Sequence, residues 1–383
     1  MSELHNTSNA ANIRQTLLAT VSAFVLIASI PETALAADRD RPTIWIEGGW
    51  HFESVAGDAD PFLPPLDAST RASGFPSLAA IENELGRTYG AEGSISFHPH
   101  GSDWVFTASA RYGRSQTTRR LINQKTIIGP QLKQTTFQSG GLVAVPVTPT
   151  FPAYATHNIK NYESHAIADF QIGKDVGIGL FGHGTDTVIS FGARYAQMNA
   201  KSKGNSFADP VATFEQGEFV FGPIHKYYIR ALHHASAAVM ERTDSLHALG
   251  PSLSMKNTTG LLGTVDDGQI ALDWGVNAAL LFGRQKAKTT HHSTVRDYGG
   301  PSGTAVQAVH TYTPVNRTRS RMVTVPNIGG FAALSYRFPN AKLSAGYRAD
   351  FFFGAKDSGF ETRSTTDVGF HGPYATISIG LGG

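Results

Sequence analysis

The sequence predicts an all-β fold, in the form of an up-and-down antiparallel transmembrane β-barrel of about ten strands. Three observations support this prediction. Apolar and polar residues alternate over ten segments, the connections between these segments are alternately long and short, and no stretch beyond the N-terminal 36 residues is apolar enough for a transmembrane helix. A chain without such a helix can span a bilayer only as a closed barrel.

The alternation is clearest in the last third of the chain. Segment 269–284 has an apolar residue at every second position, from Ile270 to Phe282, and Asp273 lies between them. A period of two places apolar side chains on one face of a strand and polar side chains on the other. A soluble sandwich would cover the apolar face with a second sheet, whereas a membrane barrel turns that face toward lipid.

Ten segments follow this pattern along the chain. They are Thr43–Glu53, Thr88–His98, Asp103–Ser115, Lys160–Gly173, Thr187–Asn199, Ser245–Lys256, Gln269–Arg284, Pro326–Phe338, Lys342–Phe353 and Phe370–Leu381. The sixth segment has the weakest alternation. Ile167, Leu281 and Phe331 break the pattern because they put apolar side chains on the polar face.

The connections between these segments favour a barrel over a sandwich. The long ones are Ser54–Arg87, Gln116–Ile159, Ala200–Asp244 and Gln285–Val325, with a smaller one at Gly354–Val368. The short ones are Pro99–Ser102, Lys174–Asp186, Asn257–Gly268 and Pro339–Asn340. Outer-membrane barrels have long extracellular loops and short periplasmic turns, so an N-terminus in the periplasm places every long connection outside.

Two of the long connections have predicted structure of their own. Ser77–Gly86 (SLAAIENELG) has the composition of a short helix. Gly222–Arg242 fits either a helix or two further strands, and the second alternative would raise the strand count to twelve.

The N-terminus predicts a cleaved signal peptide over residues 1–36, followed by the barrel over 37–383. Arg14 precedes an apolar run from Leu17 to Ile30, and Ala34-Leu35-Ala36 has the small-residue spacing of a cleavage site. The chain has no cysteine, which suits passage through an oxidising periplasm. Its formal net charge of +2 argues against nucleic acid as a partner.

Charged residues recur on the polar faces of the predicted strands and would point into one lumen. The predicted lumen-lining residues are Glu47, Glu92, Arg111, Asp169, Arg194, Asp273, Arg348 and Asp350. They would form either a charged constriction that selects solutes or a structural network of ion pairs that fills the barrel. The second interpretation is favoured because a barrel of eight strands is largely filled by its own side chains, and ten strands add little room.

The apolar faces carry residues suited to the membrane interface. Trp50, Trp104, Tyr112 and Trp274 are predicted to belong to aromatic girdles. A basic cluster at the start of the second long connection would reach lipid phosphates or remain solvated, and comprises Arg114, Arg119, Arg120, Lys125 and Lys133.

Catalytic and metal chemistry have little support in the sequence. The chain lacks the G-x-S-x-G, H-E-x-x-H and P-loop motifs and has no cysteine nucleophile, so we predict no enzyme, no catalytic residue and no cofactor. His233-His234 and His291-His292 are adjacent pairs, and neighbouring side chains on a strand point in opposite directions. Such pairs are poor chelates, so no metal site is predicted.

Several stretches resemble the Legionella-type major outer membrane protein family. They are NYESHAIADFQIGKDVGIGL, ISFGARYAQM, LHALGPSLS, DWGVNAALLFGRQKA and GFAALSYRFPNAKLSAGYRADFFFG, in that order, and SFHPHGSDWVFTASARYGRS fits the early strands. The resemblance extends from about Ile44 to Leu381 and implies a porin-like barrel in the outer membrane. The chain departs from many outer-membrane barrels in ending with Gly383 and not with an aromatic residue, which assembly machinery reads.

These observations lead to one functional expectation and one alternative. The expected role is passive passage of small hydrophilic solutes or a structural role in the cell envelope; the alternative is adhesion or binding through long extracellular loops around a plugged lumen. The expected location is the outer membrane, and the expected partners are outer-membrane lipid, lipopolysaccharide and the barrel-assembly machinery. The sequence leaves the oligomeric state open.

Overall fold

A computed structural model describes residues 43–57, 87–100, 102–176, 185–299, 305–311, 314–359 and 363–382. The predicted signal peptide and the predicted helix Ser77–Gly86 lie outside these ranges. Within them, the chain forms thirteen strands. No helix in the described part of the chain has the length and apolarity needed to cross a membrane.

The strands are longer than the alternation predicted. Their bounds are β1 Ile44–Gly57, β2 Arg87–Phe97, β3 Trp104–Ile128, β4 Leu132–Gln138, β5 Gly141–Val147, β6 Thr150–Asp175, β7 Thr185–Phe221, β8 Ile224–Leu262, β9 Gln269–Gly299, β10 Ala305–Thr311, β11 Val315–Phe338, β12 Ala341–Asp357 and β13 Thr365–Leu381. Each of the ten predicted segments lies almost entirely within one of the long strands.

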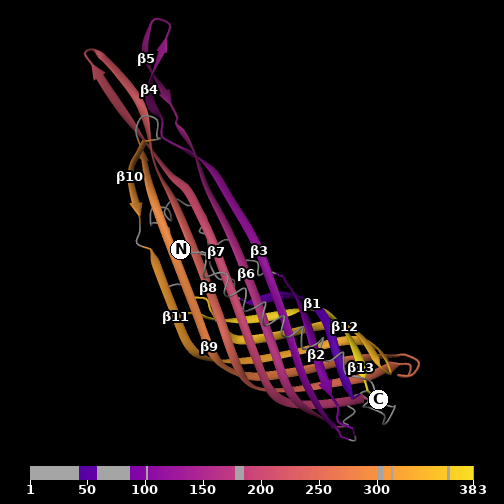
Figure 1. Cartoon of the computed structure of the whole chain (residues 1–383). Helices are drawn as coiled ribbons and strands as arrows, with labels where there is room; N and C mark the ends of the chain where they lie inside the picture. The colour runs from indigo at the N-terminus through magenta and orange to yellow at the C-terminus, as the bar shows by residue number, and fades with distance from the viewer. Residues whose placement is uncertain are drawn as a thin grey trace.

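Ten of these strands close into a ring (Figure 1). The order is β1-β2-β3-β6-β7-β8-β9-β11-β12-β13, β13 pairs with β1, and all neighbours are antiparallel. The all-β barrel of ten strands is therefore confirmed. The alternative of twelve is wrong, because residues 224–242 form the first half of β8 and not two additional strands of the ring.

The strands are strongly staggered around the ring. Backbone pairing followed from Ile44 through every strand in turn returns to β1 at Ala56, a shift of twelve residues. A stagger of this size requires a steep tilt of the strands to the barrel axis. Because of this stagger, the sequence positions of the side chains at one level of the barrel cannot be found by counting residues from the start of each strand.

Most of the predicted long loops are continuations of strands, which corrects that part of the sequence analysis. The β7–β8 ribbon pairs continuously from Thr185↔Thr259 to Phe221↔Ile224, apart from one irregularity. Beyond the ring these strands form an extension that we define as residues 122–156, 206–238 and 293–299, including the β4–β5 hairpin (Figure 1). The extension lies beyond the apolar outer belt, and its buried residues include polar ones such as Ser206, Asp209 and His233, so no apolar alternation in the sequence reveals these strands.

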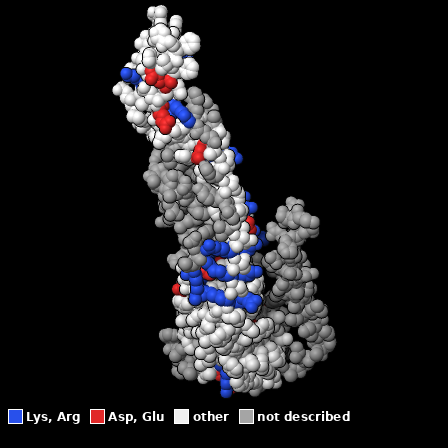
Figure 2. Space-filling view, turned by 90° about the vertical axis from the view of Figure 1, so that its left-hand side faces the viewer, with Lys and Arg blue, Asp and Glu red and all other residues white. Residues whose placement is uncertain are grey.

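The outer face of the ring is apolar. A ring made from one sheet has no second layer of protein, so only side chains that point inward can be deeply buried. Apolar side chains exposed on the outside include Trp50, Phe106, Phe170, Phe191, Leu249, Leu253, Phe282, Ile328, Leu334, Leu343, Ile377 and Ile379. Figure 2 shows the lower part of the molecule as a surface almost free of charge. This belt is typical of a transmembrane β-barrel.

Candidate functional site in the barrel interior

Five charged residues meet inside the ring. We call Glu53, Arg111, Asp169, Arg194 and Asp350 the central network. The Arg111 guanidinium donates to Glu53 Oε1 at 3.1 Å and to Asp350 Oδ2 at 2.7 Å. These three residues come from β3, β1 and β12, so the contacts join the two ends of the barrel sequence. The side chains of Glu53 and Asp350, which accept from Arg111, are themselves buried, so both ion pairs are poorly accessible to water.

Arg194 is the second centre of the network. Its Nε donates to Asp169 Oδ1 at 2.7 Å and its Nη2 to Asp169 Oδ2 at 3.0 Å, a bidentate arrangement. Its Nη1 donates to Asn277 Oδ1 at 2.6 Å and also to Asn327. Arg194 therefore links β7 to β6, β9 and β11.

The other predicted lumen residues also lie on the inner face. Arg348 forms a bidentate pair with Glu92 and lies over the Tyr374 ring, with its guanidinium carbon 4.0 Å from the ring centroid. Lys342 Nζ donates to Asp273 Oδ2 at 3.2 Å. Glu47 Oε2 accepts from Ser378 at 2.7 Å. Each predicted lumen residue thus has a polar partner, as a network of ion pairs requires.

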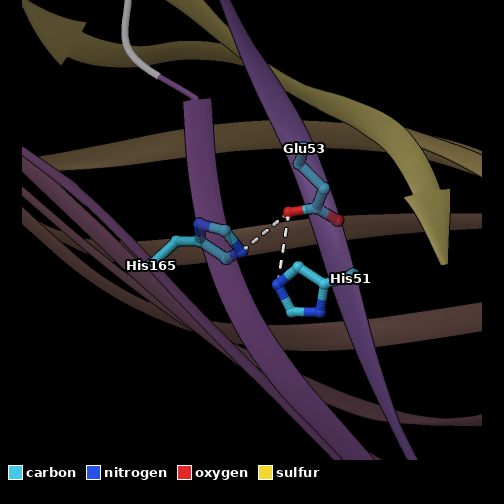
Figure 3. A group of neighbouring side chains, drawn as sticks. All are labelled: His51, Glu53 and His165. Atoms are coloured by element: carbon cyan, nitrogen blue, oxygen red, sulfur yellow. Dashed lines mark ion pairs between the residues drawn. The ribbon is translucent and has the colours of Figure 1, made fainter.

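A second group, which the sequence analysis missed, lies beside the central network. His51 and Glu53 are two positions apart on β1 and share its inner face, and His165 comes from β6. Figure 3 shows the Glu53 carboxylate facing both imidazoles. The distance from Glu53 Oε2 is 3.6 Å to His51 Nε2 and 3.2 Å to His165 Nε2, and all three side chains are 0% exposed.

Two glycines allow this arrangement. Backbone pairing places His51, Gly90, Gly113 and His165 in one lateral row across β1, β2, β3 and β6. A Cβ atom at Gly90 would overlap His51 Nε2, and one at Gly113 would overlap the His165 ring. The imidazoles therefore occupy the space that side chains at Gly90 and Gly113 would fill, and they lie close to each other. The sequence hides this row because the register of four strands is needed to find it.

An apolar layer covers the central network on the side of the extension. Its buried residues come from eight of the ten ring strands: Val55, Ile167, Ala196, Met198, Leu246, Ala248, Leu281, Val325, Phe352, Ala355 and Phe370. Leu281, Val325 and Phe352 are 0% exposed. The side chains of Ile167 and Leu281, which broke the sequence pattern, are thus part of a packed layer inside the barrel.

A hollow opens on the extension side of this layer. Met198, Leu246 and Phe370 of the layer line it, together with polar residues that include Glu163, Asp244, Gln285 and Lys356. Because the hollow shares residues with the apolar layer, a solute that enters it from the extension meets packed apolar side chains.

The predicted interface residues lie on the outer face. Trp50 is 64% and Trp104 43% exposed, and Tyr112 and Trp274 are partly exposed. In the predicted basic cluster, Arg114, Arg120 and Lys133 are exposed, while the side chains of Arg119 and Lys125 lie outside the described residues.

The adjacent histidine pairs point in opposite directions, as strand geometry requires. His233 is buried with its Nδ1 2.9 Å from Asp209 Oδ1, and His234 is exposed with its Nδ1 2.5 Å from Asp297 Oδ1. In the second pair, His291 is buried and His292 is exposed. Neither pair presents two nitrogens to one point.

The closed ring, the apolar outer belt and the charged interior define the class of this protein as a transmembrane β-barrel.

No protein-family model matches the chain, and no curated protein matches it. Among solved structures, the chain is similar at 9% identity to the transport unit of the autotransporter AIDA-I from Escherichia coli, with a TM-score of 0.21, covering 94% of this chain and 98% of that one. A mutant of the monoaromatic hydrocarbon channel TodX gives 9% identity, a TM-score of 0.15 and 92% coverage of each chain. OmpT of Vibrio cholerae gives 9% identity, a TM-score of 0.12, and coverage of 90% of this chain and 99% of that one.

Proposed function

We propose that the protein is an outer-membrane barrel with a closed interior that holds a binding extension at the cell surface. This is the adhesion alternative of the sequence analysis. The observation that carries it is a set of exposed apolar side chains at the outer ends of two neighbouring β-ribbons. The resemblance to the Legionella-type family and the assembly and lipid partners stay predictions.

The two ribbons end in tight turns. Gly140 and Gly222 have positive φ values of 104° and 59°, which glycine adopts without strain. The β4–β5 hairpin lies beside the β7–β8 ribbon: the Lys133 amide donates to Gln216 Oε1 at 2.9 Å, and the Tyr227 amide donates to Thr135 Oγ1 at 2.7 Å. The two turns therefore lie at the same end of the extension, far from the barrel (Figure 1).

This surface, which we call the tip, is apolar. Its exposed residues are Phe137, Leu142, Val143, Phe219, Val220, Phe221 and Ile224. Phe137 is 76% and Phe221 75% exposed. Groups of large apolar side chains that remain in water are typical of a surface that binds another molecule. We infer that the tip contacts an apolar patch on a macromolecule outside the cell.

The interior favours this role over solute passage. A water-filled channel needs a polar lining, whereas the apolar layer contains four residues with no exposure, Ala196, Leu281, Val325 and Phe352. The central network adds paired charges directly beneath that layer. The barrel is then an anchor, and the extension carries the activity.

A band of cations supports the outer-membrane location within this proposal. Figure 2 shows Lys and Arg side chains gathered directly above the uncharged lower surface. On β9, the exposed residues Arg284, Lys286 and Lys288 follow Phe282 on the same outer face. Cations at this height suit the phosphate groups of lipopolysaccharide and lipid.

The tip is tested by substitution of Phe137 and Phe221 with Ser. We expect the adhesion of this variant to other cells to fall at least about tenfold. Each aromatic side chain contributes roughly 1.5–3 kcal/mol when it is buried in an interface. The measurement compares adhesion of bacteria that display the variant and the natural chain at equal density.

Ile122→Ser is the matched control, since Ile122 is an exposed apolar residue on β3, within the extension but outside the tip. It should bind as the natural chain does. Equal adhesion by all three proteins would contradict the proposed role of the tip.

The closed interior is tested separately by conductance. Purified protein in a planar lipid bilayer is expected to show no discrete open-channel steps in potassium chloride, because the apolar layer excludes hydrated ions. Steps that persist at constant voltage and change with Arg194→Gln would instead support the passage of solutes.

A further inference from the structure

We propose that His51, Glu53 and His165 bind a divalent transition-metal ion, with Zn²⁺ as the best match. The inference rests on the barrel interior alone and is independent of the proposed role of the tip. Two imidazoles and one carboxylate are a donor set that zinc uses widely, with a further position left open.

The distances fit coordination. Ligand atoms about 2.1 Å from a tetrahedral zinc ion lie about 3.4 Å from one another. Glu53 Oε2 lies 3.2 Å from His165 Nε2 and 3.6 Å from His51 Nε2. One ligand atom from each residue lies within 4.8 Å of the others. Binding would therefore need only a small movement of the two rings.

The donor atoms are otherwise unused. Within the described residues, Glu53 Oε2 and both ring nitrogens of His51 and of His165 have no hydrogen-bond partner outside this cluster, although they are buried. Unpaired buried polar atoms are unfavourable, and a shared ligand is a common reason for them. The other carboxylate oxygen, Glu53 Oε1, accepts from Arg111 at 3.1 Å, and such a contact fixes the orientation of a metal ligand.

The surrounding charges favour a cation. The central network contains two arginines, Arg111 and Arg194, against three carboxylates, Glu53, Asp169 and Asp350. With neutral imidazoles, the charges of these five residues sum to minus one. An ion of positive charge placed between the imidazoles and Glu53 would offset this excess in a region where an unpaired charge is strongly unfavourable.

The backbone provides the space. Gly90 and Gly113 separate the two histidines in their lateral row, and any larger residue there would collide with an imidazole. The metal would join β1 to β6 across the β2–β3 hairpin. It would therefore cross-link strands that share no backbone pairing.

The test uses the mature chain refolded into detergent after treatment with a chelator, with Zn²⁺ present or absent during refolding because the site is fully buried. We expect one tightly bound Zn²⁺ per chain by elemental analysis after gel filtration. His165→Gln and His51→Gln should each lower the affinity at least about 100-fold, since loss of a direct ligand exceeds the 10–100-fold effect of losing an outer contact.

His157→Gln is the matched control, because His157 is a buried histidine on β6 that lies outside the cluster. It should keep the full zinc content. X-ray absorption of zinc-loaded natural protein gives a measurement that needs no variant, and we expect two imidazoles and one carboxylate oxygen around the ion.

Two results would overturn the inference. The first is a zinc content below about one-tenth per chain in folded natural protein, which would mean that a proton shared between the imidazoles and Glu53 satisfies the cluster. The second is equal loss of zinc in His157→Gln and His165→Gln, which would place the bound ion elsewhere.

Discussion

Arg194→Met is expected to lower the free energy of unfolding by about 3–5 kcal/mol. Arg194 is 5% exposed and is the bidentate partner of Asp169. Its loss leaves the partly buried Asp169 carboxylate without its cation and removes the donor from which Asn277 and Asn327 accept hydrogen bonds. Tryptophan fluorescence during urea unfolding in detergent micelles measures the change.

Two further variants make this prediction specific. Arg284→Met removes an exposed arginine on the outer face and should change stability by about 0.5 kcal/mol or less. Arg194→Met combined with Asp169→Leu should regain most of the loss, because it removes both charges together. A loss below about 1 kcal/mol in Arg194→Met alone would mean that the interior is wet enough to solvate Asp169.

Phe352→Ala is expected to destabilise the barrel by about 3–5 kcal/mol. Phe352 is 0% exposed in the apolar layer, and its ring packs against Phe370 with centroids 6.2 Å apart. Truncation to Ala removes buried apolar surface and leaves a cavity that the rigid ring of strands cannot close. The same unfolding measurement reports the loss.

The adjacent residue supplies the control. Phe353 points outward and is 43% exposed, so Phe353→Ala leaves no enclosed cavity and detergent chains fill the space. Its loss should be about 1–2 kcal/mol. Equal losses at the two positions would show that the layer is not closely packed and would weaken the case for a closed interior.

The sequence predicted the ring well because lipid acts on one face of each strand. Every second residue must be apolar there, so segments such as 269–284 could be recognised as strands. The same alternation predicted that Arg111 and Arg194 lie on the inner face, where both are buried. The same physics explains the error in the long connections. Residues 206–238 lie outside the apolar belt, so their strands carry no alternating pattern.

The contacts inside the ring were beyond sequence reasoning. Asp350 reaches Arg111 across 239 positions of the chain, and that meeting depends on a stagger that accumulates over ten strands. The histidine cluster depends on the same register, through Gly90 and Gly113. Ile167 and Leu281 were visible as exceptions, but their shared layer became apparent only in three dimensions.

The pairing of β13 with β1 has a consequence for biogenesis. Ile44 faces Leu381, so the first and last strands form the seam of the cylinder. Until β1 and β13 pair, both edges of the sheet keep amide and carbonyl groups that hydrocarbon cannot satisfy. Loss of β13, the seventeen residues Thr365–Leu381, would therefore leave the ring unable to close.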